Sequence, residues 1–386
     1  IRTEFFNVLD WLRERACARQ HGLGTKIPWD NDWLVESLAD SVIYMSFYTM
    51  AKFVNSGEIL AENMSDEFFN YVFYGDGNSE TVSGNAKVTT SKLEEIRNEF
   101  LYFYPVDSRH SGRDLVPNHL TFFVLNHVAI FPKENWPKEI VVNGSVMMNG
   151  KKMSKSMGNI IPLRDAIKKY GADPIRLSIL ISAELLQDAD FNSESISGIK
   201  NKLESMYDEC TKFNNPGKIG TEPEDIWIQS RLSKLISEVT ESMEKMRLRE
   251  SLHHILYGFD SELQWYMKRA NAKNRNDISG VLNKVLSTRV SMISPFAPHI
   301  AEEMWEKLGN SEMVSKSSWP KQEEQTDDTS VQNESLLSSV MNDISNIIKV
   351  TKIVPKTITI YTADNWKSKA YHKILIGVNS GETNVG

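Results

Sequence analysis

An apolar run that leads into a polar loop rich in glycine and lysine is the feature that most limits the fold of this chain. Residues 140–142 read Ile-Val-Val, and residues 149–159 read Asn-Gly-Lys-Lys-Met-Ser-Lys-Ser-Met-Gly-Asn. Residues 163–170 then have the composition of a helix. A strand, a loop and a helix in this order offer backbone N–H groups and mobile ammonium groups to an anion. The sequence therefore predicts an α/β fold with a phosphate-binding loop, although such a composition alone more often marks a solvated turn.

The loop also carries a recognisable pentapeptide. Residues 152–156 spell KMSKS. This stretch resembles the signature of class I aminoacyl-tRNA synthetases, and its surroundings resemble leucyl-tRNA synthetases of the archaeal and eukaryotic cytosolic type. The resemblance implies that Lys155 meets the departing phosphates of ATP and that Lys152 supports closure of the loop. The catalytic set it implies is Lys152, Ser154, Lys155 and Ser156.

A second candidate segment lies at residues 111–120, Ser-Gly-Arg-Asp-Leu-Val-Pro-Asn-His-Leu. Glycine lets the backbone approach a base or sugar closely, and a carboxylate two residues later can accept hydrogen bonds from both ribose hydroxyls. By the same resemblance, Gly112 and Asp114 would hold the adenosine of ATP. His119 would lie near the aminoacyl end, or would simply be a histidine satisfied within the core. The full set implied for ATP binding is Gly112, Asp114, His119, Met147, Met148, Met153 and Lys155.

The second half of the chain is predicted to be helical. Ile228, Leu232, Leu235 and Val239 recur at spacings of three and four, as on a helix that faces other helices. With the resemblance, this gives a Rossmann-like α/β half, then an all-α helical bundle, then the start of a small α+β C-terminal domain. The expected boundaries are 1–190 for the C-terminal half of the catalytic domain, 191–320 for the bundle, 321–335 for a linker and 336–386 for a truncated C-terminal domain.

Several local elements follow from periodicity and turn residues. Asp173 is expected to cap the helix that begins at Pro174. Leu125, Val128 and Ile130 are expected in the core. The remaining local expectations are a helix over 4–18, a turn over 21–30, a helix over 41–54, a short helix over 93–100 and a strand over 357–361. Residues 55–90 are expected to form a polar surface excursion that is partly ordered by the aromatic residues Phe68, Phe69, Tyr71, Phe73 and Tyr74.

The formal net charge of −7 over 386 residues does not point to a simple polyanion binder. Binding of tRNA needs a local positive stripe and not a positive total, so a tRNA partner is compatible with this charge. The best local candidates for phosphate contacts are Lys268, Arg269, Lys273 and Arg275. Charge clusters of this kind are also common on plain solvated surface.

The two cysteines, Cys17 and Cys210, are far apart and lack the spacing of a zinc site or a disulfide framework. No protein-bound metal is predicted, and Mg²⁺ is expected only as part of the ATP complex. No apolar run reaches the length of a membrane span. We therefore expect a cytoplasmic protein without a membrane partner.

Class I synthetases also need a HIGH signature, and no such stretch occurs in these 386 residues. The first residue is Ile1 rather than Met. We therefore expect a fragment or a subunit that is inactive alone. The partners that the resemblance implies are ATP, leucine, tRNA(Leu) and the missing N-terminal half, in cis or as a second chain.

Two other functions stay open. The chain could belong to another class I ligase, for Met, Ile or Val, because these enzymes share the loop and the bundle. It could also be a non-catalytic tRNA-binding module derived from such an enzyme. The intact pair of lysines favours a ligase, since a retired active site has no physical need for them.

Overall fold

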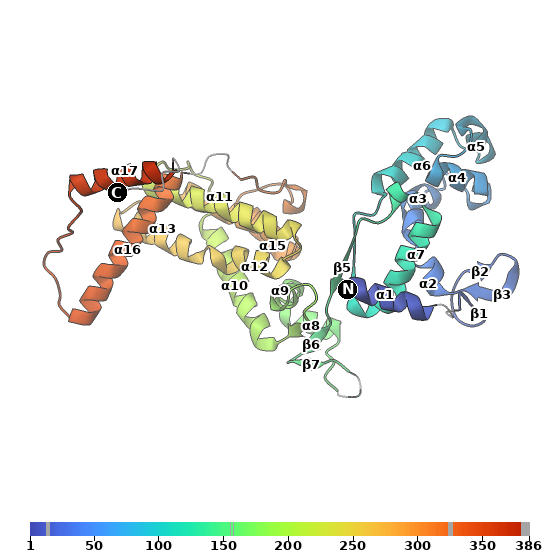
Figure 1. The fold of residues 1–386 in the computed structure, drawn as a ribbon, viewed down its shortest axis with the longest axis horizontal. Helices are drawn as coiled ribbons and strands as arrows, with labels where there is room; N and C mark the ends of the chain where they lie inside the picture. The colour runs from blue at the N-terminus through green and yellow to red at the C-terminus, as the bar shows by residue number, and fades with distance from the viewer. Residues whose placement is uncertain (13–15, 155, 157, 323–326, 380–386) are drawn as a thin grey trace. The chain divides into compact units, whose positions relative to one another are not determined.

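Most of the chain is helical, with short strands between the helices (Figure 1). The computed structural model describes residues 1–12, 16–154, 156, 158–322 and 327–379. The chain divides into two compact units, Ile1–Thr326 and Asp327–Gly386. Among the described residues, the strands form three small sheets. None of the described helices has both the length and the apolar character needed to cross a membrane.

The first sheet corrects two expectations. Helix α1 spans Arg2–Trp11, so the helix predicted over 4–18 ends early. Strands β1 (Ala18–Arg19), β2 (Lys26–Ile27) and β3 (Asp30–Val35) form an antiparallel sheet in the order β1-β3-β2, where only a turn was predicted. Ala18 pairs with Val35, and the Val35 N–H donates to the Thr25 carbonyl at 2.7 Å. Two-residue strands are too short for any alternation to show in the sequence.

Residues 37–103 form a cluster of helices, so the surface excursion predicted over 55–90 is wrong. The helices are α2 (Ser37–Asp40), α3 (Tyr44–Asn55), η2 (Ala61–Asn63), α4 (Asp66–Tyr74), α5 (Ser79–Asn85) and α6 (Thr90–Phe103). Three of the polar residues that looked like loop composition are helix caps. Ser65, Asn78 and Thr89 accept hydrogen bonds from backbone N–H groups in the first turns of α4, α5 and α6.

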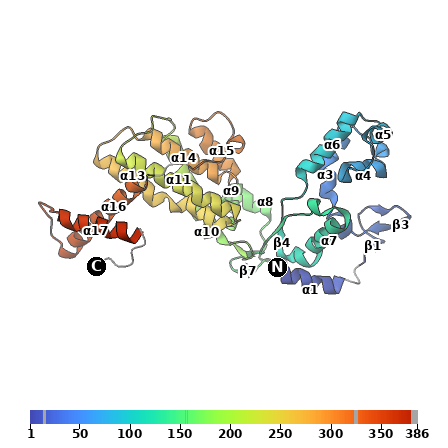
Figure 2. The same cartoon turned by 45° about the horizontal axis from the view of Figure 1, so that its top comes forward.

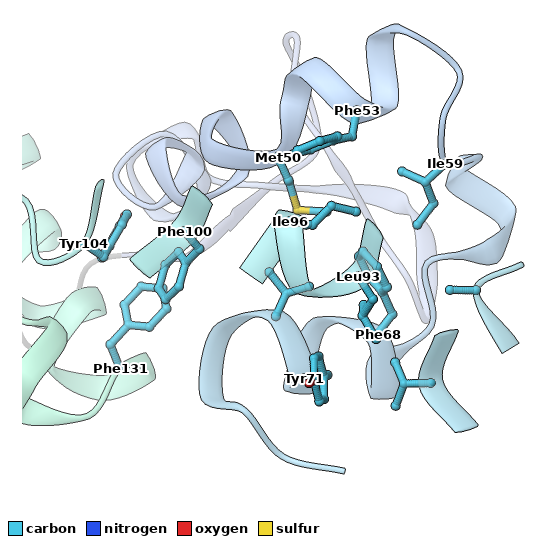
Figure 3. Close-up of a cluster of buried hydrophobic side chains, with 13 residues drawn as sticks. Met50, Phe53, Ile59, Phe68, Tyr71, Leu93, Ile96, Phe100, Tyr104 and Phe131 are labelled. Atoms are coloured by element: carbon cyan, nitrogen blue, oxygen red, sulfur yellow. The ribbon is translucent and has the colours of Figure 1, made fainter. Parts of the chain in front are cut away.

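The aromatic residues of this cluster form its core (Figure 3). Phe68 and Phe100 have no exposed surface, and the Phe100 ring stacks on the Tyr104 ring with centroids 4.6 Å apart. Figure 3 shows Phe131 on the same side of this core as Phe100 and Tyr104. Aromatic side chains bury a large apolar area, so these rings stabilise helices that are individually short.

A parallel pair of strands follows the helical cluster. Strand β4 (Ser108–Gly112) pairs with β5 (Glu139–Asn143), and the connection contains η3 (Arg113–Leu115), η4 (Val116–Leu120), α7 (Thr121–Ile130) and η5 (Lys133–Asn135). Phe123 of α7 is fully buried. Leu125, Val128 and Ile130, expected in the core, are 42 to 44% exposed. Leu125 and Val128 line a pocket between α7 and α1, and Ile130 lies on a different face of the helix.

A third sheet carries the start of the loop at residues 149–159, which contains the KMSKS letters and is called the signature loop below. Strands β6 (Val146–Met148), β7 (Lys151–Lys152) and β8 (Ala189–Phe191) lie in the order β7-β6-β8. Helices α8 (Leu163–Tyr170) and α9 (Ala172–Ser182) lie between β7 and β8 in the chain.

The expected cap at Asp173 is also corrected. Helix α9 begins at Ala172, before Asp173, and its N-cap residue is Gly171. The Asp173 carboxylate instead accepts from the Ile300 N–H at 2.6 Å and contacts His299 Nδ1 at 2.9 Å. It therefore caps a helix that is distant in sequence, which a local pattern cannot reveal.

The helical bundle is confirmed as predicted. Its helices are α10 (Ser193–Lys212), α11 (Pro223–Glu244), α12 (Leu248–His253), η7 (His254–Gly258), α13 (Asp260–Ala272), α14 (Ser279–Ile293) and α15 (Pro298–Lys307), followed by η8 (Val314–Lys316). The stripe of Ile228, Leu232, Leu235 and Val239 is buried. Figure 2 shows α14 beside α11 and α15, and these pairs pack directly.

The second unit contains α16 (Asp328–Thr351) and α17 (Asn365–Asn379). Helix α16 begins inside the segment expected to be a linker, and the Asp327 side chain caps it by accepting from the Ser330 N–H at 3.0 Å. Residues 357–361 are not in a strand, although their alternation predicted one. A strand needs a partner, and alternation in one segment does not provide it.

Candidate active site

Strands β4 and β5 end side by side. The candidate segment at residues 111–120 therefore lies next to the residues that lead to the signature loop. In the β4–β5 register Gly112 lies opposite Asn143. Ligands of parallel sheets bind beyond the carboxyl ends of the strands, which is where Gly112 and Asn143 lie. Asp114 follows in η3 and is exposed.

Gly112 lies close to the Asp114 carboxylate. A Cβ at this position would lie 2.6 Å from Asp114 Oδ1, which is closer than real contacts allow. The absence of a side chain thus lets the Asp114 carboxylate fold back over the strand end. The backbone of Gly112 is extended, with φ of −76°, which any residue can adopt, so a side chain here would need only a shift of the exposed Asp114 carboxylate.

His119 lies one turn further on, half-buried in η4. Burial lowers its pKa, and the positive charge of Arg109 lowers it further. Its Nδ1 is buried, and no hydrogen-bond partner for this atom is found among the described residues. The imidazole therefore has a lowered pKa and one buried ring nitrogen without a hydrogen-bond partner among the described residues.

The link from β5 to β6 is short and rigid. A Cβ on Gly144 would lie 2.3 Å from the Gln187 carbonyl oxygen, so only glycine fits between the segments. The Gly144 N–H donates to the Leu185 carbonyl at 2.9 Å, and the Ser145 N–H donates to Asp188 Oδ1 at 2.7 Å. The direction of β6 is thereby fixed relative to the end of β5.

The hairpin of β6 and β7 carries the first lysine of the signature. Met147 pairs with Lys152 and Met148 with Lys151, and Met147 also pairs with Asp190 of β8. Both methionines are half-buried, and both lysines are exposed. The Gly150 N–H donates to Asp190 Oδ1 at 2.8 Å, so the tip of the hairpin is attached to β8.

Beyond the hairpin, the loop is held by its own polar groups. Ser154 Oγ and Ser156 Oγ lie 2.6 Å apart. Asn159 Oδ1 accepts from the Ser154 N–H at 2.9 Å, and Asn159 Nδ2 donates to the Lys152 carbonyl at 3.0 Å. Lys155, the lysine expected to meet the phosphates, lies outside the described residues. Met153 is half-buried.

Arg113 adds a contact that the sequence did not reveal. Its guanidinium hydrogen-bonds to the Glu4 carboxylate, and this bond raises its pKa, with a smaller contribution from the negative charge of Asp188. Asp188 is the residue that holds Ser145. The negative charge of Asp188 thus acts on Arg113, next to Gly112 and Asp114 in the chain. Asp188 and Asp190 lie about forty residues after the strands they hold, so no local motif could identify them.

The four cations proposed for phosphate contacts lie at α13 and just after it, and three of them are paired with carboxylates of α11. Arg275 contacts Glu224 at 3.0 Å and Asp225 at 2.8 Å. Lys273 contacts Glu224 at 2.8 Å, and Arg269 contacts the same carboxylate at 3.7 Å. Lys268 is exposed, with Nζ 5.4 Å from the centroid of the Trp265 ring.

The carboxylates of these ion pairs are buried. The side chains of Glu224 and Asp225 are 0% exposed. Burial by itself would raise the pKa of Glu224, but its hydrogen bonds to Lys273 and Arg275 outweigh that effect, so the pKa is lowered. Tyr266 donates to Asp225 Oδ1 at 2.7 Å, and burial raises the pKa of this phenol. The cluster is thus a structural network of the bundle.

In chemical terms, the site offers an exposed carboxylate, an imidazole with a lowered pKa and exposed ammonium groups beyond the ends of parallel strands. That set suits a nucleotide, whose ribose hydroxyls pair with a carboxylate and whose phosphates pair with lysines. Within the described part of the chain, no group of three or more His, Cys, Asp or Glu side chains is arranged to hold a metal ion.

Two known families match successive parts of the chain. The family described as tRNA synthetases class I (I, L, M and V) matches residues 80–192. The family described as the anticodon-binding domain of tRNA ligase matches residues 225–367. The first match contains both candidate segments, and the second contains most of the bundle.

Several proteins are similar along nearly the whole chain. A leucine–tRNA ligase of Methanosarcina mazei is 40% identical over 375 residues, which is 96% of this chain and 38% of the relative. One from Methanocaldococcus jannaschii is 41% identical over 387 residues, or 99% of this chain and 40% of the relative. Leucine–tRNA ligase 2 of Sulfolobus acidocaldarius is 40% identical over 366 residues, covering 94% and 39%. The chain thus spans about two fifths of the length of these relatives.

Two solved structures share the fold. A LeuRS–tRNA–LeuAMS ternary complex from Agrobacterium radiobacter K84 aligns with a TM-score of 0.54 at 19% identity, over 80% of this chain and 35% of that one. Methionyl-tRNA synthetase of Mycobacterium tuberculosis with methionyl-adenylate aligns with a TM-score of 0.55 at 17% identity, over 81% and 58%. The prediction of a Rossmann-like half followed by a helical bundle is confirmed.

Proposed function

Since this chain belongs to the class I tRNA synthetase family and is homologous over nearly its whole length to leucine–tRNA ligases, we propose that it forms the signature-loop half and the tRNA-binding bundle of such a ligase. The identity of about 40% to several leucine enzymes supports leucine over methionine, isoleucine or valine as the amino acid. The enzyme would make leucyl-adenylate from leucine and ATP and then transfer leucine to tRNA(Leu).

The first step is an in-line displacement at phosphorus. A carboxylate oxygen of leucine attacks the α-phosphorus of ATP, and the bond from that phosphorus to the oxygen of the departing pyrophosphate breaks. Negative charge grows on the leaving phosphates, so positioned cations and backbone N–H groups stabilise the transition state. Mg²⁺ would enter with ATP and share in neutralising this charge. In the second step a ribose hydroxyl of tRNA attacks the leucyl carbonyl carbon, and AMP leaves.

The residues of the site divide between the nucleoside and the phosphates. Gly112 and Asp114 would receive the ribose and adenine, with the main-chain groups of Met147 and Met148 at the adenine edge. His119 would lie near the aminoacyl end. The signature residues Lys152, Met153, Ser154, Lys155 and Ser156 would close over the phosphates, with Lys155 engaging the departing pyrophosphate.

One observation carries this proposal. The β4–β5 pairing places Gly112 opposite Asn143, and the rigid link through Gly144 leads directly to the hairpin in which Met147 pairs with Lys152. The segment with Gly112 and Asp114 and the signature loop are therefore connected through β5, Gly144 and β6, which are consecutive in the chain. A cation on such a loop can engage late in the reaction, where a point charge has most effect on rate.

The bundle would bind the tRNA. Its family description names an anticodon-binding domain, and the Agrobacterium structure of similar fold holds a tRNA. The proposed phosphate contacts are Lys268, Arg269, Lys273 and Arg275. Of these, Lys268 is exposed beside Trp265, whereas the others are already paired with carboxylates and would need to share their charge.

The ligase would need more protein than this chain. The parallel sheet of β4 and β5 has only two described strands, and three apolar side chains of α7 are more than two fifths exposed. We place the N-terminal half of the catalytic domain there, in cis or as a second chain, in a cytoplasmic enzyme. A non-catalytic tRNA-binding module remains the second candidate, and the intact lysine loop speaks against it.

The test is a lysine substitution in the complete enzyme. We expect Lys155→Ala to slow leucine-dependent exchange of pyrophosphate into ATP by about 100- to 1,000-fold, as loss of one preorganised charge does elsewhere. Affinity for leucine should change little, because the lysine acts on the phosphates. Lys168→Ala, in α8 outside the loop, is the control and should retain the wild-type rate. Equal losses of rate and leucine affinity would contradict the assigned role.

A further inference from the structure

We infer that Asn159 is a positioning residue whose side-chain amide fixes the backbone of Lys152 and Ser154 in the arrangement that adenylate formation needs. This inference rests on the proposed function, because it assigns a cause for the geometry of the same loop. Asn159 directly follows Gly158 at the end of the loop and is half-buried. It belongs neither to the KMSKS letters nor to the groups proposed to touch ATP.

The amide makes two hydrogen bonds to the backbone of residues 152–154, which are called the lysine segment below. Its Oδ1 accepts from the Ser154 N–H at 2.9 Å, and its Nδ2 donates to the Lys152 carbonyl at 3.0 Å. A backbone N–H can only donate and a backbone carbonyl can only accept, so the partners fix which way the amide points. Asn159 therefore pairs with this segment much as a neighbouring strand would.

The same segment is fixed from its other side by the sheet. Lys152 pairs with Met147 across the hairpin, and the Gly150 N–H is held by the Asp190 carboxylate at 2.8 Å. The backbone at Lys152 thus has a strand on one side and the Asn159 amide on the other. Without the amide, the hairpin would still form, but the chain leaving it toward Ser154 would lose both of its bonds to Asn159.

Position matters here because the loop acts through charge. The favourable effect of an ammonium group on a developing phosphate charge depends on where that group sits, and a displacement of about 1 Å in an active site can reduce a rate about 100-fold. Asn159 carries no charge, and both hydrogen bonds of its amide are made to backbone groups. Its effect on catalysis must therefore pass through the lysine segment, which is what separates a positioning residue from a catalytic one.

The kinetic test uses the complete enzyme with three variants. Asn159→Ala removes both bonds, and Asn159→Asp keeps the acceptor for Ser154 but turns a carboxylate oxygen toward the Lys152 carbonyl. We expect both variants to lower kcat for leucine-dependent pyrophosphate exchange by about 10- to 100-fold, with the KM for leucine unchanged. Asn310→Ala is the matched control: Asn310 is also half-buried and donates to a backbone carbonyl, that of Trp305, at 3.1 Å.

A second readout needs no activity. Amide hydrogen exchange at Ser154 should be slow in the wild-type protein, faster in Asn159→Ala, and still slow in Asn159→Asp, which retains the acceptor. Thermal unfolding of all variants should match the wild type, because the bonds lie in an exposed loop.

The outcomes separate the inference from the proposed function. Wild-type kcat in Asn159→Ala, or unprotected Ser154 in the wild type, would overturn the inference while leaving the ligase proposal intact. A wild-type complete enzyme with the expected pattern of exchange at Ser154 but no leucine-dependent activity would overturn the proposed function, and with it the catalytic role of Asn159.

Discussion

At the scale of single residues, the bundle buries two carboxylates, Glu224 and Asp225, and pairs them with cations. Glu224 and Asp225 are fully buried, and Arg275, only 9% exposed, contacts both. A buried carboxylate without a partner is very unfavourable, so these residues are stable only as a set. The sequence identified the cations correctly as a cluster, but it could not show that their partners lie on a helix some fifty residues earlier.

Arg275 is the member whose loss should matter most for stability. Arg275→Met keeps the apolar stem and leaves two buried carboxylates with fewer partners, so the free energy of unfolding should fall by about 3 to 5 kcal/mol. Arg247→Met is the matched control, because the Arg247–Glu250 pair is 3.4 Å long and its side chains are 54% and 43% exposed. That change should stay within about 1 kcal/mol. Urea unfolding measures both, and equal effects would contradict the network.

The same network gives a direction for pH. The pKa of Glu224 in the folded chain lies below its ordinary value of 4.5. A carboxyl with a depressed folded pKa binds protons more readily when unfolded, so its contribution is complete above pH 4.5 and is lost as the pH falls through the folded pKa. The stability of the wild type should therefore decline in this acidic range more steeply than that of Arg275→Met.

At the scale of elements, sequence periodicity predicted the long helices well and the short ones poorly. The stripe of α11 from Ile228 to Val239 continues over about three turns and gives a clear helical period. In residues 55–90, the helices α4 and α5 have only 9 and 7 residues, and their caps supply the Ser and Asn that resembled a loop. Short helices are stabilised by tertiary packing, which a local pattern does not contain.

This packing can be tested at Phe68. The side chain of Phe68 is 0% exposed at the centre of the α4 and α6 core. Phe68→Ala should lower the free energy of unfolding by about 3 to 5 kcal/mol, because it removes buried area and leaves a cavity. Phe6→Ala, at a phenylalanine that is 57% exposed, should cost less than about 1 kcal/mol. A small effect at Phe68 would mean that residues 55–90 are the surface excursion that the sequence predicted.

The candidate site shows the same division between local and distant information. Gly112, Asp114 and Lys152 could be proposed from the sequence because they match residues of the family motifs, and the strand register connects the segments that carry them. Asp188 and Asp190 could not, because they hold the hairpin from positions about forty residues later, just before β8 and within it. Asp173 was assigned to its own helix, although its carboxylate caps α15. Residues that act on distant backbone leave no periodic signal.

At the scale of the whole molecule, the described sheets are small for a nucleotide-binding domain. The parallel sheet that ends at Gly112 and Asn143 has two described strands. Leu125, Val128 and Ile130 of the adjoining helix are more than two fifths exposed. Leucine–tRNA ligases that match this chain are much longer, since the chain covers only 38 to 40% of them. These three observations support the proposal that a ligase would need more protein than these residues.

We therefore expect the isolated 386-residue chain to show no leucine-dependent exchange of pyrophosphate into ATP, although it should fold. Adenylate formation requires leucine, ATP and the lysine loop to be fixed together, and a two-stranded sheet presents only one wall for them. Adding the remainder of the enzyme, fused or as a separate chain, should restore exchange, and the Lys155→Ala form of this chain should fail to restore it. Exchange by the isolated chain at the rate of the complete enzyme would mean that the described half holds both substrates by itself.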